Sequence, residues 1–270
     1  MEALYKLGNY KFKQMLGEGM YAVVYLAEQD AEPWAIKVIN KGKCRKRGTR
    51  HAQKEIAALL RLGKKAGVVH LKEWRENETF FFIVLSYCPG YSLDNTPTLL
   101  SVQEILYTAL SILETLKRIH SLGVFHLDIK PSNVIVSRHG ACLVDFGCSI
   151  ISENGVVEKH MLPFEGTPAY MAPEMIKSTD PFISLESLDV WSFGCLLYYL
   201  AAGKNAFVSA SLYSLYPKIL HCKVDYTGMP AEIEQICRKI FIQLPNERIC
   251  LMNLIALVKS KLVSPLQQNV

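Results

Sequence analysis

The chain has 270 residues, of which 50% are hydrophobic and 20% are charged, and its formal net charge is +5. This length and composition exclude a disordered or fibrous protein. They fit one large globular domain or two small ones, with a core that needs no disulfide or structural metal. The mild positive charge suits an anionic ligand, but it does not by itself indicate nucleic-acid binding.

The N-terminal region is predicted to form a hairpin with a glycine-rich turn. Residues 10–14 alternate aromatic and polar side chains, and residues 23–27 are mainly β-branched or aromatic, so each is expected to be a strand. Between them lie Gly17 and Gly19, whose backbone N–H groups can approach an anion because no Cβ blocks the way. Dinucleotide-binding motifs share this glycine pattern, but they require a helix after it. The second strand therefore favours a hairpin that covers phosphates.

The next predicted strand, residues 34–39, contains a lysine within an apolar run. Lys37 would be costly to bury unless it is paired, and the alternative is an edge-strand lysine that reaches solvent. A helix predicted over residues 51–62 carries Glu55 beside its apolar stripe. A Lys37–Glu55 pair would satisfy both charges and hold the lysine against a phosphate. The basic run between strand and helix, residues 41–50, is predicted to be a solvated loop rather than a docking patch.

The middle of the chain is predicted to change from mainly β to mainly helical structure. Residues 80–85 form a strongly apolar strand, and turn-forming residues 86–90 follow, where we place an internal boundary. Ser101 and Glu104 have the spacing of a capping box that opens a long helix, and Gly123 is expected to end it. The buried stripe of this helix is predicted to consist of Ile105, Leu106, Ala109, Leu110, Leu113, Leu116 and Ile119.

Two polar loops follow this helix, each next to apolar, strand-like residues. The first loop, within residues 125–133, contains Asp128, Lys130 and Asn133, and the second is residues 145–147, Asp-Phe-Gly. Polar residues gathered on loops between buried strands are typical of functional sites. Two ordinary turns would not need an acid, a lysine and an amide at this spacing.

The C-terminal part is predicted to be helical after a mobile loop. Residues 148–165 show few helix or strand signals, and residues 166–174 end this loop. The apolar run 190–202 is too short to span a membrane and is predicted to be a buried helix. The last residues, 265–270, are expected to fray.

The eight cysteines are predicted to be reduced thiols. None belongs to a C-x-x-C pair or to a Cys/His cluster with zinc spacing, which favours a reducing compartment, the cytoplasm or the nucleus. Cys148 follows the Asp-Phe-Gly loop directly and is expected to be a packed thiol, with a redox- or electrophile-sensitive site as the alternative. The cysteines are Cys44, Cys88, Cys142, Cys148, Cys195, Cys222, Cys237 and Cys250.

Taken in order, these motifs resemble the eukaryotic protein kinase domain over about residues 10–262. The resemblance implies a bilobal α+β fold. A small, mainly antiparallel-β N-lobe would cover about residues 8–88 and a larger, mainly helical C-lobe about 89–262, in one domain spanning 1–270 with a short C-terminal tail. The motifs are the glycine-rich hairpin, Lys37, Glu55, H-x-D-x-K-x-x-N at 126–133, D-F-G at 145–147, A-P-E at 172–174 and D-x-W-S-x-G at 189–194.

The resemblance also implies ATP and Mg²⁺ as cofactors and a role for each matching residue. Asp128 would accept or orient the proton of the substrate hydroxyl, and Lys130 would stabilise the transferring phosphoryl group. The implied catalytic residues are Asp128, Lys130, Lys37, Glu55 and Thr167, and the implied metal ligands are Asn133 and Asp145. The implied nucleotide contacts are Gly17, Gly19, Val24, Ala35, Lys37, Leu85, Ser86, Cys88, Ile135 and Asp145. Glu174 is expected to pair with Arg248, and Asp189 to anchor the first polar loop.

The sequence departs from the family pattern at a few positions. Leu127 precedes Asp128 where most members have an arginine that grips a phosphate on the activation loop. The His-Leu-Asp form resembles the Mos kinases and the Myt branch of the Wee kinases. We therefore hypothesise that activity does not require activation-loop phosphorylation. Ala22 replaces the third glycine of the phosphate loop, and Ser92 stands where an acid often meets the ribose.

Lys130 and Thr167 resemble the pattern of serine/threonine kinases, which implies protein substrates that carry these hydroxyls. Wee-type kinases share a similar catalytic loop and modify tyrosine, so dual specificity stays open. The alternatives are a pseudokinase scaffold and a kinase for small molecules or lipids. No nucleic-acid or membrane partner is expected. Regulation would come from surfaces of this domain or from a partner protein, and the oligomeric state stays open.

Overall fold

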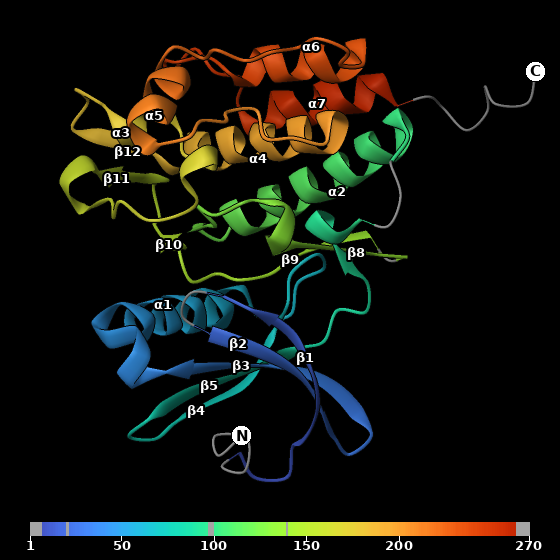
Figure 1. The fold of residues 1–270 in the computed structure, drawn as a ribbon, viewed down its shortest axis with the longest axis vertical. Helices are drawn as coiled ribbons and strands as arrows, with labels where there is room; N and C mark the ends of the chain where they lie inside the picture. Colours follow the sequence, from blue (N-terminus) through green and yellow to red (C-terminus); the bar gives the residue numbers. More distant parts are fainter. Residues whose placement is uncertain (1–6, 20–21, 97–99, 139, 263–270) are drawn as a thin grey trace, which may run out of the picture.

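The computed structural model describes residues 7–19, 22–96, 100–138 and 140–262, and within this range the side chains of residues 43–47 are not described. The expected fraying of residues 265–270 lies outside the described residues. Two lobes are stacked along the long axis of the molecule, with a twisted sheet and one helix in one lobe and most of the helices in the other (Figure 1). This is the bilobal α+β architecture that the sequence predicted.

The N-lobe is built on a five-stranded antiparallel sheet with the order β1-β2-β3-β5-β4. The glycine-rich hairpin is confirmed as the β1–β2 connection. The predicted solvated loop over residues 41–50 is wrong, because helix α1 begins at Lys41 and takes in the whole basic run. The bounds are β1 Lys11–Glu18, β2 Ala22–Gln29, β3 Glu32–Asn40, α1 Lys41–Leu62, β4 Leu71–Glu76 and β5 Phe80–Ser86.

The pairing register of β2, β3 and β5 sorts their residues onto two faces, because directly paired residues share a face and neighbours along a strand alternate. Lys37 pairs with Val24, and Ala35 pairs with Leu85, so all of these lie on one face. The same face packs against α1 and the main core. The other face has its own small core, made of Leu7, Tyr10, Ala27, Ile36, Val38, Phe82 and Val84.

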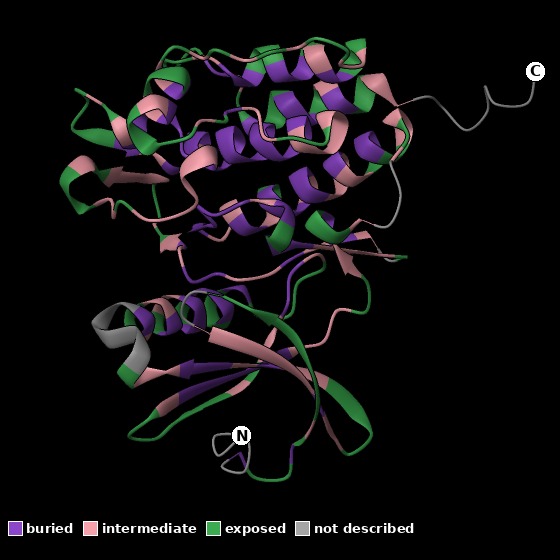
Figure 2. Cartoon of the chain, in the orientation of Figure 1, coloured by how far each residue is buried: buried purple, intermediate pink, exposed green. Residues whose placement is uncertain are grey.

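The C-lobe is organised around α4 (Leu185–Ala202), which is buried along most of its length (Figure 2). Helix α2 (Val102–His120) packs against α4 and carries the predicted capping box, in which Ser101 Oγ accepts from the Glu104 N–H at 3.3 Å. The predicted stripe of α2 is buried except for Leu110, which is half-buried. The other helices are α3 Pro173–Ile176, α5 Leu212–Leu220, α6 Ala231–Ile240 and α7 Leu251–Lys261.

Several short strands lie in the C-lobe, outside its main helices. A three-stranded sheet has the order β6-β8-β9, and its strands β8 and β9 lie near the junction of the lobes (Figure 1). Strand β7 leads into the first polar loop. Among the described helices, none combines the length and apolar character that crossing a membrane would require. The strands are β6 Tyr91–Ser92, β7 Val124–Phe125, β8 Val134–Ser137 and β9 Gly140–Leu143.

The mobile loop predicted over residues 148–165 is wrong in its structure. The segment contains β10 (Ile150–Ile151), which pairs with β7, and β11 (Val156–Glu158), which pairs with β12 (Phe182–Ser184). A short 3₁₀ turn follows at Lys159–Met161. These strands are two or three residues long, and their partners lie far away in the sequence. A local hydrophobic pattern therefore could not reveal them.

Candidate active site

The two polar loops lie side by side because their flanking strands pair. Strand β8 follows the first loop, β9 precedes the second, and the two strands form an antiparallel pair. The Val144 N–H donates to the Asn133 carbonyl at 3.0 Å, which ties the second loop directly to the first. The sequence prediction that these loops share one site is therefore consistent with the backbone geometry.

Asp189 holds the first loop from below, as predicted. Its carboxylate accepts the backbone N–H groups of His126 at 2.9 Å and Leu127 at 2.7 Å. His120 Nε2 lies 2.8 Å from the same carboxylate, a contact that the sequence analysis missed because the histidine reads only as the last residue of a helix. Leu127 has a φ of +63°, a conformation that costs a non-glycine residue about 1–3 kcal/mol. The Asp189 bonds hold the loop in this conformation.

Asp128 lies at the centre of a compact hydrogen-bonded group. Its Oδ2 accepts from Lys130 Nζ at 2.7 Å and from Asn133 Nδ2 at 3.0 Å. Its Oδ1 accepts from Thr167 Oγ1 at 3.0 Å, and Lys130 Nζ also lies 3.0 Å from that hydroxyl. The structure thus brings together the predicted catalytic residues of the C-lobe around one carboxylate.

Lys37 joins the two lobes through a pair of carboxylates. Its Nζ lies 2.7 Å from Glu55 Oε2 on α1 and 2.8 Å from Asp145 Oδ1 on the second loop. The predicted Lys37–Glu55 pair is confirmed, and Asp145 is an additional partner. One lysine thus serves two carboxyl groups, one from each lobe.

Burial and charge act in opposite directions on this cluster. Burial alone would lower the pKa of Lys37, but Asp145 and Glu55 outweigh it and raise the pKa above its usual value. The Asp145 carboxyl is only partly exposed, and its partial desolvation favours the neutral form, yet the Lys37 charge holds its pKa well below the usual range. Burial raises the pKa of Glu55, with Lys37 opposing this and Asp145 adding to it. Lys37 and Asp145 are therefore both charged at neutral pH.

The predicted nucleotide contacts come from both lobes. Val24, Ala35, Lys37 and Leu85 share the sheet face described above, and Ile135 lies on β8. The Gly19 N–H donates to the Ala22 carbonyl at 2.8 Å, which closes the turn of the hairpin. A Cβ on Gly17 would meet no atom of the described residues within 4 Å, so contacts with this part of the chain do not require glycine there. The remaining predicted contacts are Ser86, at the end of β5, and Cys88, in the segment that leaves β5.

The implied Mg²⁺ ligands have suitable donor atoms. Asn133 donates its amide N–H groups to the carbonyl and carboxylate of Asp128, so its amide oxygen is the atom that could reach a cation. Asp145 supplies a carboxylate, and oxygen atoms of this kind are what Mg²⁺ prefers. No cluster of three or more His, Cys, Asp or Glu side chains suited to a metal ion occurs among the described residues. Phosphate oxygens and water would have to complete the ligand shell.

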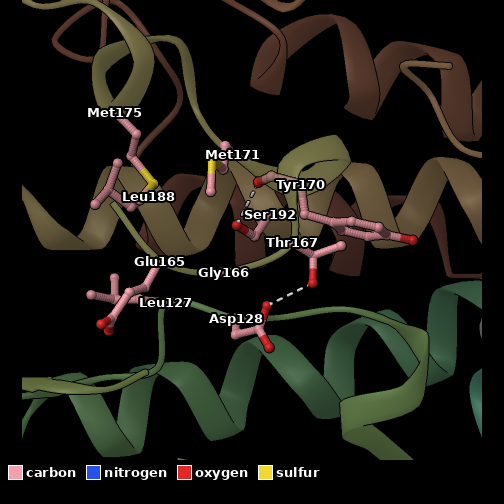
Figure 3. A pocket seen from close by; sticks show the side chains of 10 residues that line it. All are labelled: Leu127, Asp128, Glu165, Gly166, Thr167, Tyr170, Met171, Met175, Leu188 and Ser192. Carbon is pink, nitrogen blue, oxygen red and sulfur yellow. Dashed lines mark hydrogen bonds between the residues drawn. The ribbon is translucent and has the colours of Figure 1, made fainter. Parts of the chain in front are cut away.

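A pocket opens beside Asp128 (Figure 3). Its lining is largely apolar, with Leu127, Met171, Met175 and Leu188, and Thr167 lies at its edge on the Asp128 side. The Leu127 side chain contributes to this lining at the position where most members of the family resembled above have arginine.

Glu165 connects the segment after the second loop to α1. Its Oε2 lies 3.1 Å from Lys54 Nζ and 3.6 Å from His51 Nε2, and its side chain is only 9% exposed. Lys54 and His51 counteract the effect of burial and hold the pKa of Glu165 below its usual value. The sequence analysis missed this contact, because no motif marks a glutamate that meets a lysine 111 positions away.

Two further predictions concern residues near the site. Arg248 and Glu174 form the expected pair, with Nη1–Oε1 at 2.8 Å and Nη2–Oε2 at 2.9 Å. Burial and the neighbouring acids Asp128 and Asp145 raise the pKa of Cys148 to about 12. The thiol form of Cys148 is a weak nucleophile, which favours the packed-thiol interpretation over the reactive one.

Comparison with known proteins agrees with this geometry. A family model described as "Protein kinase domain" matches residues 10–257. The serine/threonine-protein kinase PKH1 of Saccharomyces cerevisiae is 29% identical, over 89% of this chain and 34% of the yeast protein. The CBL-interacting protein kinase 11 of Oryza sativa subsp. japonica is 32% identical, over 90% of this chain and 49% of its own length. The CBL-interacting serine/threonine-protein kinase 13 of Arabidopsis thaliana is 35% identical, over 79% and 43%. The chain thus spans a third to a half of the length of these relatives.

Proposed function

The chain belongs to the protein kinase domain family, and from that premise we propose that it transfers the γ-phosphate of ATP to serine or threonine hydroxyls of proteins. The observation that carries the proposal is the arrangement around Asp128, whose carboxylate is bonded to Lys130, Asn133 and Thr167. A substrate hydroxyl that replaced the Thr167 contact at Oδ1 would be oriented for in-line attack. Relatives named as serine/threonine kinases support the same substrate class.

The charged groups have different tasks in this reaction. Lys130 would stabilise the negative charge of the transferring phosphoryl group, and Lys37, fixed by Glu55, would position the remaining phosphates. A Mg²⁺ ion held by Asp145 and Asn133 would supply charge neutralisation at the phosphates when bound. The protein's own contribution is to place these groups before the nucleotide arrives, so that little reorganisation remains for the chemical step.

We propose in addition that activity does not require phosphorylation of the activation segment, by which we mean residues 148–165, after the Asp-Phe-Gly loop. Leu127 cannot grip a phosphate, and Glu165 already supplies a carboxylate that bonds to Lys54 on α1. The two serine hydroxyls of this segment, at Ser149 and Ser152, also form hydrogen bonds within the protein. Ser149 Oγ donates to the Phe146 carbonyl at 2.7 Å, and Ser152 Oγ lies 2.8 Å from the Val156 carbonyl. These contacts are the support for a segment that is ordered without modification.

The transfer itself is tested with radiolabelled ATP on a peptide array that offers serine, threonine and tyrosine acceptors. We expect label on serine or threonine peptides, dependence on added Mg²⁺, and none with Asp128→Asn. Label on tyrosine peptides as well would favour the dual-specificity, Wee-like alternative. No label above the Asp128→Asn background would overturn the proposal in favour of a scaffold that works by contact.

Independence from phosphorylation is tested on the same array after treatment with phosphatase. We expect the treated protein, and a variant with alanine at Ser149 and Ser152, to retain activity. Thr179→Ala, outside the activation segment, is the matched control. A large loss after phosphatase treatment would contradict this part of the proposal.

Relatives named as CBL-interacting also lead us to propose a regulatory partner, which a pull-down with the full chain would identify.

A further inference from the structure

Two cysteine thiols meet at the junction of the lobes. Cys88 lies in the hinge segment, residues 87–90 between β5 and β6, and Cys142 lies on β9. Their Sγ atoms are 2.9 Å apart although the residues are 54 positions apart in the sequence. Both side chains are half-buried, so they are neither sealed in the core nor fully in solvent.

Paired strands hold the two backbones in this position. A Cβ on Gly90 would lie 2.2 Å from the carbonyl oxygen of Val136, so the hinge segment passes directly against β8. On β8 itself, Ile135 is paired with Cys142. The hinge segment and β9 are thus both fixed to the same strand. The contact between Cys88 and Cys142 is a consequence of the fold rather than of two long, mobile side chains.

The separation and the surroundings of the thiols suit a reaction between them. A disulfide has an S–S length of about 2.05 Å, so bond formation needs a movement of only about 0.9 Å. The two thiols are also unequal. Hydrogen bonding with Cys142 lowers the pKa of Cys88, whereas the same bond and burial raise the pKa of Cys142. Cys88 is therefore the better nucleophile and Cys142 the resolving thiol.

We propose that Cys88 and Cys142 form a dithiol modification site, at which a hydroperoxide converts the pair into a disulfide that links the hinge segment to β9. The Cys88 thiolate attacks the terminal peroxide oxygen, the O–O bond breaks, and an alcohol leaves after it takes up a proton. The Cys142 sulfur then attacks the sulfenic acid on Cys88, the S–S bond forms, and water leaves. The two thiols lose two electrons and two protons, which reduce the hydroperoxide to alcohol and water.

The position of the link predicts its effect on the nucleotide. The hinge segment would meet adenine, and β9 leads through Val144 to Asp145, so the disulfide would tie together two parts of the nucleotide site. A covalent tie would hinder the hinge movement by which nucleotides enter and leave. This effect rests on the proposed function, whereas formation of the disulfide does not.

Peptide mapping tests the site directly. The reduced full chain is treated with tert-butyl hydroperoxide, alkylated, digested and analysed by mass spectrometry. We expect one linked peptide pair containing Cys88 and Cys142, two hydrogens lighter than the separate peptides, which dithiothreitol separates. Recovery of both residues as separate alkylated peptides, or a link from Cys88 to another cysteine, would overturn the proposal. Because this readout uses the unmodified sequence, it does not depend on how any variant folds.

Variants and a second probe sharpen the result. Cys88→Ser and Cys142→Ser should each abolish the link, and Cys250→Ser, at an exposed position before α7, should leave it unchanged. Phenylarsine oxide, which bridges two thiols without oxidation, should add once to the reduced chain and to neither Cys88→Ser nor Cys142→Ser. Equal addition to all proteins would contradict a paired site. Slower release of a fluorescent ATP analogue after oxidation is the expected functional effect. An unchanged release rate with the link present would overturn only the effect on the nucleotide.

Discussion

Two ion clusters in this molecule use the same chemistry and differ in how completely they are closed. In the C-lobe, Glu174 and Arg248 form a bidentate pair with side chains only 3% and 1% exposed. Between the lobes, Lys37 is shared by Glu55 and Asp145, and the Asp145 side chain is 45% exposed. The first cluster pairs one cation with one carboxylate, and the second places two carboxyl groups against one cation.

The hydrogen bonds show the same difference. Arg248 also donates to the carbonyl oxygens of Ser187 and Ile242, so its guanidinium is surrounded by acceptors. In the second cluster, Lys37 Nζ is the shared donor, 2.7 Å from Glu55 Oε2 and 2.8 Å from Asp145 Oδ1. A buried pair whose hydrogen bonds are satisfied has no need of a further ligand, and its removal is costly when only one partner is lost. A cluster in which two carboxyl groups share one cation, and in which the Asp145 carboxylate is partly exposed, can still bind a cation, which fits the proposed Mg²⁺ ligand Asp145.

The comparison predicts that the open cluster controls catalysis. Lys37→Met should lower phosphate transfer to peptide substrates by about 10²–10³-fold, because it removes preorganised charge at the phosphates. The rate should be measured at saturating ATP, with circular dichroism to confirm that the variant is folded. Lys13→Met is a matched control, since Lys13 forms an exposed ion pair with Glu28 on the outer strands. Transfer by Lys37→Met within a few-fold of the unchanged protein would break the comparison.

The closed pair should instead control stability. Arg248→Met leaves the Glu174 carboxylate buried without its partner, and the free energy of unfolding should fall by about 3–5 kcal/mol. The double change Glu174→Leu with Arg248→Met removes both charges and should recover much of this loss. Urea denaturation of both variants measures the difference. If the double variant is no more stable than Arg248→Met, unpaired charge is not the cause.

The Glu174–Arg248 and Lys37–Glu55 pairs could be anticipated from the sequence because their members belong to motifs with fixed spacing, whereas the contact of Lys37 with Asp145 was not predicted. Lys37 stands in an apolar strand, and Glu174 follows Ala-Pro in a segment typical of the family. The hydrogen-bonded group around Asp128 and the anchoring role of Asp189 could be predicted from the sequence for the same reason. These motifs bring residue types to defined places, and a strand or a helix then fixes the side-chain direction.

The contacts that escaped prediction depend on the folded path rather than on a motif. Glu165 lies in a segment that was predicted to be a loop, and its partner Lys54 lies on the part of α1 that was predicted correctly. The basic residues 41–50 were predicted as a loop because their charge resembled a solvated run, although α1 includes them. Cys88 and Cys142 lie close together only because the hinge segment and β9 both pack on β8. Periodicity within a segment carries no information about such meetings.

Glu165 lies between the two clusters in its degree of closure, and it should have an intermediate effect. Glu165→Gln removes the charge that holds Lys54 and should weaken the attachment of α1 by about 1 kcal/mol, or about five-fold in the ratio of attached to detached α1. Peptide phosphorylation should fall by at most the same factor. Lys54→Met should have the same effect, and the double variant should be no worse than either single variant. Additive losses would show that the two residues act separately.

The smallest predicted effect is a pH dependence that arises at His51, beside Glu165. Burial and the charge of Lys54 lower the pKa of His51 below its usual 6.5, despite the opposing charges of Glu165 and Asp145. The folded protein therefore binds this proton less readily than the unfolded chain does. As the pH falls through 6.5, the unfolded chain takes up the proton first, and the free energy of unfolding decreases until the folded-state pKa is passed.

His51→Gln should be less sensitive to acid than the unchanged protein in thermal denaturation between about pH 7.5 and 5.5. His70 also has a lowered pKa from burial, so His70→Gln is the necessary control. If only His70→Gln reduced the acid sensitivity, the link between α1 and Glu165 would be independent of pH, and Lys54 alone would maintain it.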